Sequence, residues 1–303
     1  MLRDAVGCDG MPGRDGPGTR AEGKKRNMTT VAIVGAGRLG GALLAALLEA
    51  GRQPSDLVIV ERDAARAAAL SDRYGVDVLA PAAAAGKADM LVLGVKPQDM
   101  GTALAEIAPA VDGSTLVVSL AAGVTTAFVE DRLPSAPPVV RVMTNTPLLV
   151  GEAMSAICAG RHADTGHLDA VEELLAPVGR VVRVPESQLD AVTALSGSGP
   201  AYFFYVIDAM IEAGVLVGLP RPLATELVVQ TALGSARMLR AGASSGAGGT
   251  GGEHPALLRE AVTSPAGTTA AALRELDRAA VRAAVLDAVE AAWVRSRELG
   301  GAS

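Results

Sequence analysis

The stretch VAIVGAGRLGGALLAALL, residues 31–48, decides the fold of this chain. Four apolar residues that favour a strand lead into Gly-x-Gly-x-x-Gly, and an alanine- and leucine-rich run that favours a helix follows. Gly35 permits a tight turn, Gly37 lets backbone N–H groups approach a pyrophosphate, and Gly40 lets the helix pack close to the strand. Because unpaired N–H groups of the helix would face the phosphates, the stretch predicts a dinucleotide-binding turn. A glycine-rich turn in a nucleotide-free α/β protein is the alternative.

The composition is that of a globular protein with two domains. The 303 residues are half apolar, and the formal net charge of −6 argues against a nucleic-acid binder. Two cysteines, Cys8 and Cys158, are too few for a disulfide framework, which favours a reducing, cytoplasmic compartment. The most apolar long run, residues 201–219, is interrupted by Asp208 and Glu212, so we expect a buried helix and not a membrane span.

Neither a metal site nor a catalytic triad is expected. No Cys/His cluster has metal-ligand spacing, and the serines have no visible His and Asp partners. The three histidines stand in polar surroundings and are interpreted as surface residues: His162, His167 and His254. The chemistry must then come largely from a bound cofactor that the protein orients.

The first part of the chain alternates strand and helix signals, which predicts a doubly wound parallel sheet over residues 28–188. Strands are expected at 31–34, 57–60, 76–79, 90–95, 115–119 and 139–143, and pieces at 153–158 and 181–184 extend the sheet. Helices are expected at 38–50, 64–73, 97–110 and 164–176. Residues 1–27 have no apolar period, which indicates a disordered tail or a true start at Met28.

Four loops follow the expected strands of this sheet: Gly35–Leu39, Gly94–Pro97, Leu120–Gly123 and Thr144–Pro147. Ligands of open α/β sheets bind beyond the carboxyl ends of the strands, so we expect the loops to line one crevice. Asn145, in the last loop, is accordingly expected to contact the cofactor.

Two charged residues after the second strand bear on the choice of cofactor. Glu61 lies 21 positions beyond Gly40, about where an acidic residue meets a ribose 2′-hydroxyl. Arg62, beside it, suits a 2′-phosphate. An adjacent charge pair on a loop can also have no role, so the sequence leaves NADP or NAD open.

From residue 189 to 303 the expected structure is an all-helical domain. Helical runs are expected at 189–196, 200–217, 221–241, 256–262, 268–276 and 278–298, and a glycine-rich insertion spans 242–252. Such apolar helices with few aromatics often complete their core with a second subunit, which predicts a homodimer. Coverage by the first domain is the alternative.

The segment VTSPAGTTA, residues 262–270, opens one of these helices with Ser264, Gly267, Thr268 and Thr269. Unpaired N–H groups, the positive end of the helix dipole and hydroxyls would together suit a small carboxylate. Ordinary N-capping by Ser or Thr is the alternative.

With these motifs the sequence resembles the pyrroline-5-carboxylate reductases. The resemblance runs from Thr29 to Leu299 and rests most on the segments 190–202 and 262–273, which are more specific than the glycine fingerprint. Further matching segments are 33–39, 95–97, 119–123 and 143–147. The family implies a Rossmann domain, a helical dimerisation domain, and reduction of 1-pyrroline-5-carboxylate to L-proline by NADPH, with NADH as an alternative. It also implies dimers that exchange helices and that several members assemble into pentamers of dimers.

The resemblance also implies roles for individual residues. Thr269 is expected to be the proton donor near the imine nitrogen, and Glu186, Thr268 and Thr269 to contact substrate. The expected cofactor contacts are Val34, Gly35, Ala36, Gly37, Arg38, Leu39, Arg62, Gly94, Val95, Lys96, Pro97, Leu120, Ala121 and Ala122.

The chain departs from the family pattern in three places. Ala266 stands where the family usually has Gly, so alanine would cost about 1 kcal/mol if that position needs a positive φ. Ala82 stands where an Asn often touches the adenosine end, and the insertion 242–252 lies just before the substrate loop. These differences bear on affinity more than on reaction type.

Two other functions compete with the reductase. A β-hydroxyacid dehydrogenase has a similar domain pair but needs a lysine general acid in its helical domain, and residues 190–241 contain no lysine. A non-catalytic NADP-sensing protein would bind the cofactor without turnover.

Overall fold

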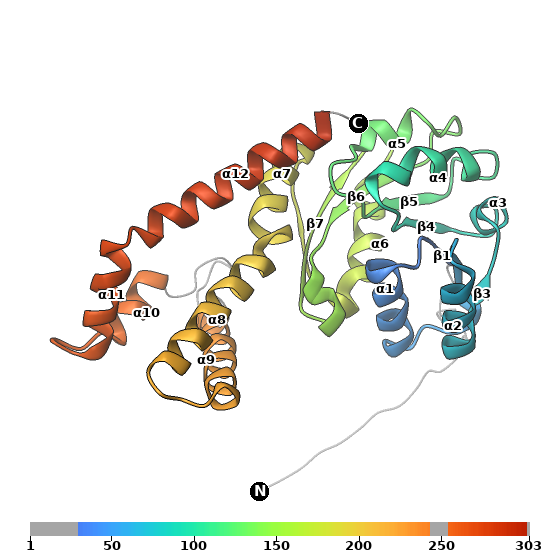
Figure 1. The fold of residues 1–303 in the computed structure, drawn as a ribbon. Coiled ribbons are helices and arrows are strands. Elements are labelled where there is room, and N and C mark those ends of the chain that lie inside the picture. The colour runs from blue at the N-terminus through green and yellow to red at the C-terminus, as the bar shows by residue number, and fades with distance from the viewer. Residues whose placement is uncertain (1–29, 243–253, 302–303) are drawn as a thin grey trace, which may run out of the picture.

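A computed structural model describes residues 30–242 and 254–301. The expected tail 1–27 and nearly all of the insertion 242–252 lie outside the described residues. Figure 1 shows two parts, a sheet with helices on both faces and a group of long helices at its side.

Eight strands form one sheet in the order β3-β2-β1-β4-β5-β6-β7-β8. The first six strands of this order are parallel, and β1 is central among them, next to β4. This is the doubly wound arrangement, and the reversal of strand order between β1 and β4 leaves a crevice at the carboxyl ends. The strands are β1 Val31–Val34, β2 Leu57–Val60, β3 Asp77–Val78, β4 Met90–Leu93, β5 Leu116–Ser119, β6 Val139–Met143, β7 Ala153–Ala159 and β8 Gly179–Arg183.

The extension of the sheet by the last two pieces is confirmed, but one pair of neighbouring strands in the extended sheet is not parallel. β7 runs antiparallel to β6, and β8 then pairs parallel with β7. Only a short 3₁₀ segment, Thr146–Val150, joins β6 to β7, and it ends at Gly151 with φ +71°. A parallel pair needs a crossover of about a dozen residues or more, so this short link forces a reversal.

Helices cover both faces of the sheet and create two buried cores. On one face Leu43, Leu44 and Leu47 of α1 pack with Leu174 of α6. On the other, side chains of α3, α4 and α5 pack together, with Leu104 fully buried. The helices are α1 Arg38–Glu49, α2 Ala64–Tyr74, α3 Pro81–Ala85, α4 Met100–Ile107, α5 Thr126–Glu130 and α6 Thr165–Leu175. The short helices α3 and α5 were not expected from the sequence.

Helices alone make up the rest of the described chain. They are α7 Leu189–Val192, α8 Gly199–Leu216, α9 Arg221–Gly242, α10 Pro255–Ala261, α11 Thr268–Arg278 and α12 Val281–Gly301. A π-helical segment, Thr193–Gly197, links α7 to α8. The helical pattern is confirmed closely, and the π segment is the part that the 3.6-residue period could not predict.

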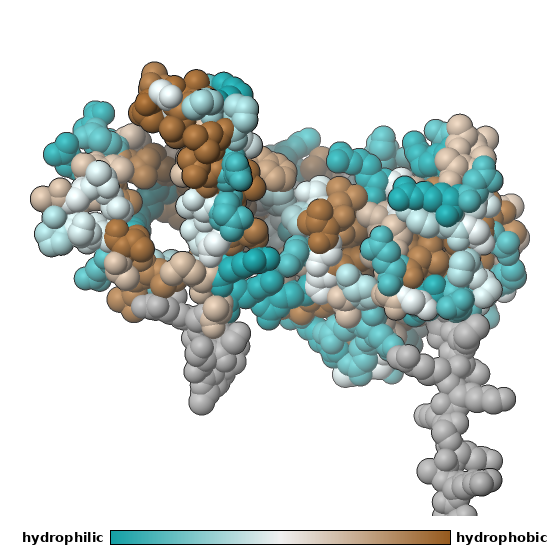
Figure 2. All heavy atoms as spheres, turned by 90° about the horizontal axis from the view of Figure 1, so that it is seen from below, coloured by the Kyte–Doolittle hydropathy of each residue, from teal (hydrophilic) through white to brown (hydrophobic). Residues whose placement is uncertain are grey.

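The expectation that residues 201–219 form a buried helix is wrong for the single chain. Tyr205 is 80% exposed and Leu216 is 86% exposed. Figure 2 shows apolar side chains gathered over this helical part. The continuous helical run Glu186–Leu216 is also apolar enough to cross a membrane by length and composition, which alone is weak evidence. The first domain therefore leaves this surface uncovered.

Candidate active site

The glycine turn after β1 has the geometry that a dinucleotide requires. Gly35 adopts φ +91°, and a Cβ added to it would lie 3.0 Å from the carbonyl carbon of Gly94. A Cβ on Gly40 would collide with the carbonyl oxygen of Gly35, whereas one on Gly37 would meet nothing within 4 Å. The turn is therefore packed tightly at Gly35 and Gly40, whereas the space around Gly37 is open, and a phosphate could approach the backbone there.

A cavity of about 180 Å³ lies beside this turn, which we call the glycine-turn cavity. Charged side chains of both signs surround it. Among its lining residues are Val34, Gly35, Gly37, Glu61, Arg62, Arg66, Gly94, Val95, Lys96, Asp99 and Glu106. The structure thus brings together at this cavity seven of the fifteen residues expected to hold the cofactor.

The two candidate ribose residues differ in how they are engaged. The carboxylate of Glu61 accepts hydrogen bonds from the backbone N–H of Asp63 at 3.0 Å and from Arg66 at 3.2 Å. Arg62 makes an ion pair of 3.4 Å with Glu106, and both side chains are substantially exposed. Since exposed pairs contribute little stability, the Arg62 guanidinium can turn toward a ligand at small cost.

A second cavity, of about 200 Å³, lies at the ends of α1 and β6 and is called here the Asn145 cavity. It is lined by Arg38, Leu39, Thr144, Asn145, Thr146, Leu149 and Gly197. The Asn145 amide donates to the backbone oxygen of Ser196 at 3.1 Å and accepts from the backbone N–H of Met154 at 3.0 Å. Asn145 therefore joins the sheet to the π segment while facing the cavity.

The loop after β5, Leu120–Gly123, is largely buried. Leu120 and Ala121 are buried, one in each core, while Ala122 is exposed. The loop backbone and Ala122 are therefore the parts that a ligand could reach. Pro97, which starts the 3₁₀ turn Pro97–Asp99, is exposed, as is Lys96.

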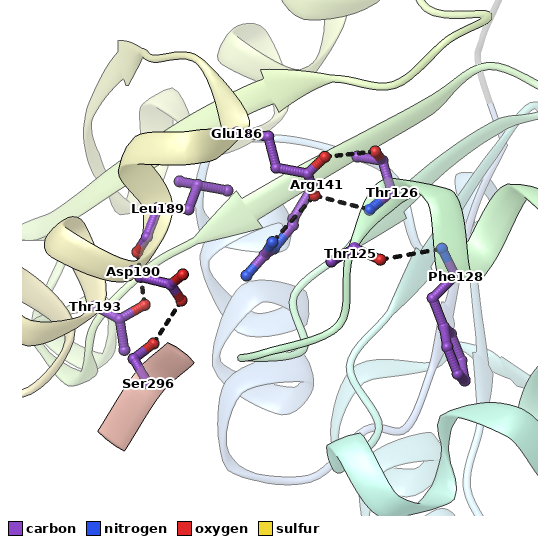
Figure 3. A network of polar contacts seen from close by, with 9 residues as sticks. All are labelled: Thr125, Thr126, Phe128, Arg141, Glu186, Leu189, Asp190, Thr193 and Ser296. Carbon is purple, nitrogen blue, oxygen red and sulfur yellow. Dashed lines mark hydrogen bonds and ion pairs between the residues drawn. The ribbon is translucent and has the colours of Figure 1, made fainter. Parts of the chain in front are cut away.

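Glu186 lies in the short 3₁₀ segment Glu186–Gln188, between the sheet and α7. Figure 3 shows its carboxylate accepting from the N–H of Thr126 at 2.8 Å, the Thr126 hydroxyl at 2.7 Å and Arg141 at 3.0 Å. Burial raises the pKa of Glu186, but the bonds from Thr126 and Arg141 outweigh burial and hold the pKa below its usual value. Burial and the charge of Glu186 raise the pKa of nearby Cys158 to about 12.

The expected substrate loop, residues 264–269, lies at the start of α11. Gly267 caps α11 without a side-chain hydrogen bond, which leaves the first N–H groups of that helix open to a ligand. Ser264 and Thr268 are exposed, and Thr269 is half-buried. Ala266 has φ +57°, so this position does require the left-handed conformation. Figure 1 shows α10 and α11 at the end of the helical part that is far from the sheet.

A glycine turn at a sheet switch point, together with a separate helical domain that carries an open helix start, defines an NAD(P)-dependent oxidoreductase. Two family descriptions match the chain. "Pyrroline-5-carboxylate reductase dimerisation" covers residues 186–299, and "NADP oxidoreductase coenzyme F420-dependent" covers residues 30–123. The chain belongs to the pyrroline-5-carboxylate reductase family.

Known relatives support this membership over nearly their full length. The chain is 47% identical to the pyrroline-5-carboxylate reductase of Mycobacterium tuberculosis, over 90% of this chain and 97% of the relative. It is 43% identical to that of Corynebacterium melassecola, over 90% of this chain and 99% of the relative.

Solved structures agree with the fold. The pyrroline-5-carboxylate reductase of Coxiella burnetii is 32% identical, with a TM-score of 0.82 over 90% of this chain and 99% of its own. The Plasmodium falciparum enzyme, solved with NADP bound, is 29% identical, with a TM-score of 0.78 over 90% of this chain and 98% of its own.

Sequence reasoning missed Thr126 and Arg141, which hold Glu186. A signal was present for each. Arg141 interrupts the apolar strand VVRVM, and a buried charge needs a partner. The pair Thr125 and Thr126 precedes a short helix, and Thr125 does cap α5 by accepting from the N–H of Phe128.

Proposed function

We propose that this chain reduces 1-pyrroline-5-carboxylate to L-proline with NADPH, with NADH as an alternative. The observation that carries the proposal is the pairing of an open glycine turn at the β1–β4 switch point with an uncapped α11 helix start. When bound, NADPH supplies the hydride that reduces the C=N bond of the cyclic imine.

The glycine turn fits the cofactor on its own geometry. The open space at Gly37 suits a pyrophosphate. The exposed Arg62 lines the glycine-turn cavity, where its guanidinium could meet a 2′-phosphate. Arg38, Leu39 and Asn145 line the second cavity, where the nicotinamide end would lie. The loop Leu120–Ala122 would support the cofactor through its backbone.

The residues at the start of α11 would hold the substrate. Open N–H groups at Thr268 and Thr269 suit its carboxylate, and the hydroxyls of Ser264 and Thr269 are donors beside it. The Thr269 hydroxyl would give the proton to the imine nitrogen as hydride reaches the carbon. By the family resemblance Glu186 is a further substrate contact, in addition to its bonds with Thr126 and Arg141.

A second copy of the chain would complete the site. The α11 start lies at the end of the helical part that is far from the sheet, whereas the cavities are lined by residues of the sheet domain and by Gly197, and the faces of α8 and α9 are exposed. We therefore propose a homodimer in which residues 264–269 of one copy close the Asn145 cavity of the other, with pentamers of dimers as the larger assembly. The proposed domains are 28–188 and 189–303, and the proposed compartment is the cytoplasm.

Turnover tests the proposal. The purified chain is mixed with NADPH and pyrroline-5-carboxylate, and the loss of NADPH absorbance and the formation of proline are both measured. Equal amounts of proline formed and NADPH consumed are expected. A chain that binds NADPH but oxidises none beyond a protein-free blank would be a sensor and not a reductase.

A further inference from the structure

The last helix returns to the sheet at its C-terminal end. Figure 1 shows α12 ending near α7 and α5. The hydroxyl of Ser296 donates to the carboxylate of Asp190 at 2.7 Å (Figure 3). Ser296 is 6% exposed, whereas Arg295 and Glu298 on the same turns are exposed and pair with each other at 2.8 Å. Among the described residues from 189 onward, Ser296 is the one buried polar side chain.

One turn beyond Ser296, the helix backbone packs on the loop after β5. A Cβ placed on Gly300 would lie 3.4 Å from the carbonyl oxygen of Gly123. Gly123 has φ +76° and follows Leu120–Ala122 directly. The end of α12 thus rests on the turn that fixes how this loop leaves the sheet.

Glu186 holds the other end of the same loop. It binds both the N–H and the hydroxyl of Thr126. Asp190 follows Glu186 by about one helical turn, so one short segment of chain contacts both Thr126 and Ser296. Residues 120–126 are therefore held at Gly123 by α12 and at Thr126 by Glu186.

We propose that Ser296 and Asp190 are positioning residues for the cofactor. They touch no ligand themselves. Their hydrogen bond seats the end of α12 on Gly123, which fixes the backbone of Leu120–Ala122 in the conformation that binds NADPH. The inference rests on the proposed function, because the role of Leu120–Ala122 as a cofactor contact is part of it. It also links the helical domain to cofactor affinity.

The test measures the dissociation constant of NADPH by its fluorescence, together with kcat, for four variants of the full-length protein. Ser296→Ala and Asp190→Ala are each expected to raise the Kd of NADPH about tenfold, with kcat at saturation within about twofold. Because the two substitutions remove the same hydrogen bond, the double variant should raise the Kd of NADPH no further than either single variant does. Asp190→Asn keeps an oxygen that accepts from Ser296 and should bind almost normally.

Glu298→Gln is the matched control, since it removes an exposed pair on the same turn of α12. If Ser296→Ala fails to fold, Gly300→Val provides the second variant. A Cβ at this position would already be in van der Waals contact with the carbonyl oxygen of Gly123, at 3.4 Å, so the two additional methyl groups of valine would press on the loop and the Kd of NADPH should still rise.

Two results would overturn the inference in distinguishable ways. Variants that lose thermal stability but keep the wild-type Kd would give Ser296 and Asp190 a merely structural role and leave the proposed function intact. A wild-type protein that binds neither NADPH nor NADH would remove the proposed function and, with it, this inference.

Discussion

The two parts of the chain differ in how completely they bury their own side chains. The sheet domain has two cores in which residues such as Ile33, Leu44 and Leu104 have no exposed surface. The helical part, from residue 189 onward, buries few side chains, and Tyr205 and Leu216 are mostly exposed. A sheet with helices on both faces completes its core within one chain, whereas these helices need further apolar surface. The glycine-turn cavity and the Asn145 cavity accordingly lie within one chain, while the catalytic site that we propose requires association.

The largest effect is expected from a charge on the exposed helical face. Tyr205→Asp costs the isolated chain little, because this side chain is 80% exposed. In an associated pair the buried carboxylate would oppose dimerisation. We expect a monomer by light scattering and a loss of turnover of more than about a hundredfold, because the substrate loop is no longer held at the cavity.

Binding of NADPH should survive in that variant, since both cavities belong to one chain. Val182→Asp is the control on the sheet domain, where the side chain is 40% exposed on β8. It should stay associated and active. A monomeric Tyr205→Asp protein with wild-type turnover would contradict the comparison.

The next effect concerns the chemistry that the helical part supplies. Thr269→Ala removes the proposed proton donor and should lower kcat/KM by about a hundredfold. Thr269→Ser keeps the hydroxyl and should restore most of it. Steady-state kinetics with NADPH and pyrroline-5-carboxylate measure both. Wild-type kinetics in the alanine variant would remove Thr269 from the mechanism.

The sequence predicted the sheet domain well because its signals are local. The glycine spacing 35–37–40 and the short apolar runs determine turn, strands and helices within a few residues. The direction of β7 was missed, because the period of a strand does not reveal the direction of its neighbour. The partners of Glu186 were also missed, since Thr126 lies 60 positions away along the chain.

In the helical part, the sequence predicted the helices but not what covers them. Its helices were predicted closely, yet the burial of residues 201–219 was not, because an apolar period does not say which molecule covers the face. The positive φ of Ala266 was a different case. The departure from the family pattern indicated only what alanine would cost if this position needs a positive φ, and the structure has φ +57° there.

Glu186, at the junction of the two parts, should affect acid stability. Glu186→Gln leaves the buried Arg141 without its counter-charge and should lower the free energy of unfolding at pH 7 by about 2 kcal/mol. Because the pKa of Glu186 is lowered by folding, its contribution is complete above the unfolded pKa of about 4.3 and is lost as pH falls through the folded value.

Urea unfolding from pH 7 to pH 3 measures this. The difference between wild type and Glu186→Gln should shrink as the pH falls below about 4. Glu172→Gln, in the exposed pair with Arg183, is the control and should show a smaller difference throughout. A difference that is constant with pH would mean that Glu186 does not ionise with a lowered pKa.

A smaller effect, confined to the sheet domain, is expected at Arg62. Arg62→Ala should raise the KM of NADPH about tenfold and leave the KM of NADH nearly unchanged, because only NADPH carries the 2′-phosphate. Glu106→Gln frees Arg62 from its 3.4 Å pair and should lower the KM of NADPH slightly. Initial rates with NADPH and with NADH measure both KM values. An equal rise in KM for the two cofactors would refute the role of Arg62 as a contact of the 2′-phosphate.

The smallest effect concerns backbone strain, which is compared between one alanine in each part of the chain. Ala266 (φ +57°) in the helical part and Ala136 (φ +50°) in the sheet domain both hold alanine in the left-handed region. Replacing either by glycine should raise the free energy of unfolding by about 1 kcal/mol, because glycine has no Cβ to strain. Only Ala266→Gly should also change the KM of pyrroline-5-carboxylate, since residues 264–269 would hold its carboxylate. Equal stabilisation with a change of KM in neither variant would place the substrate away from this loop.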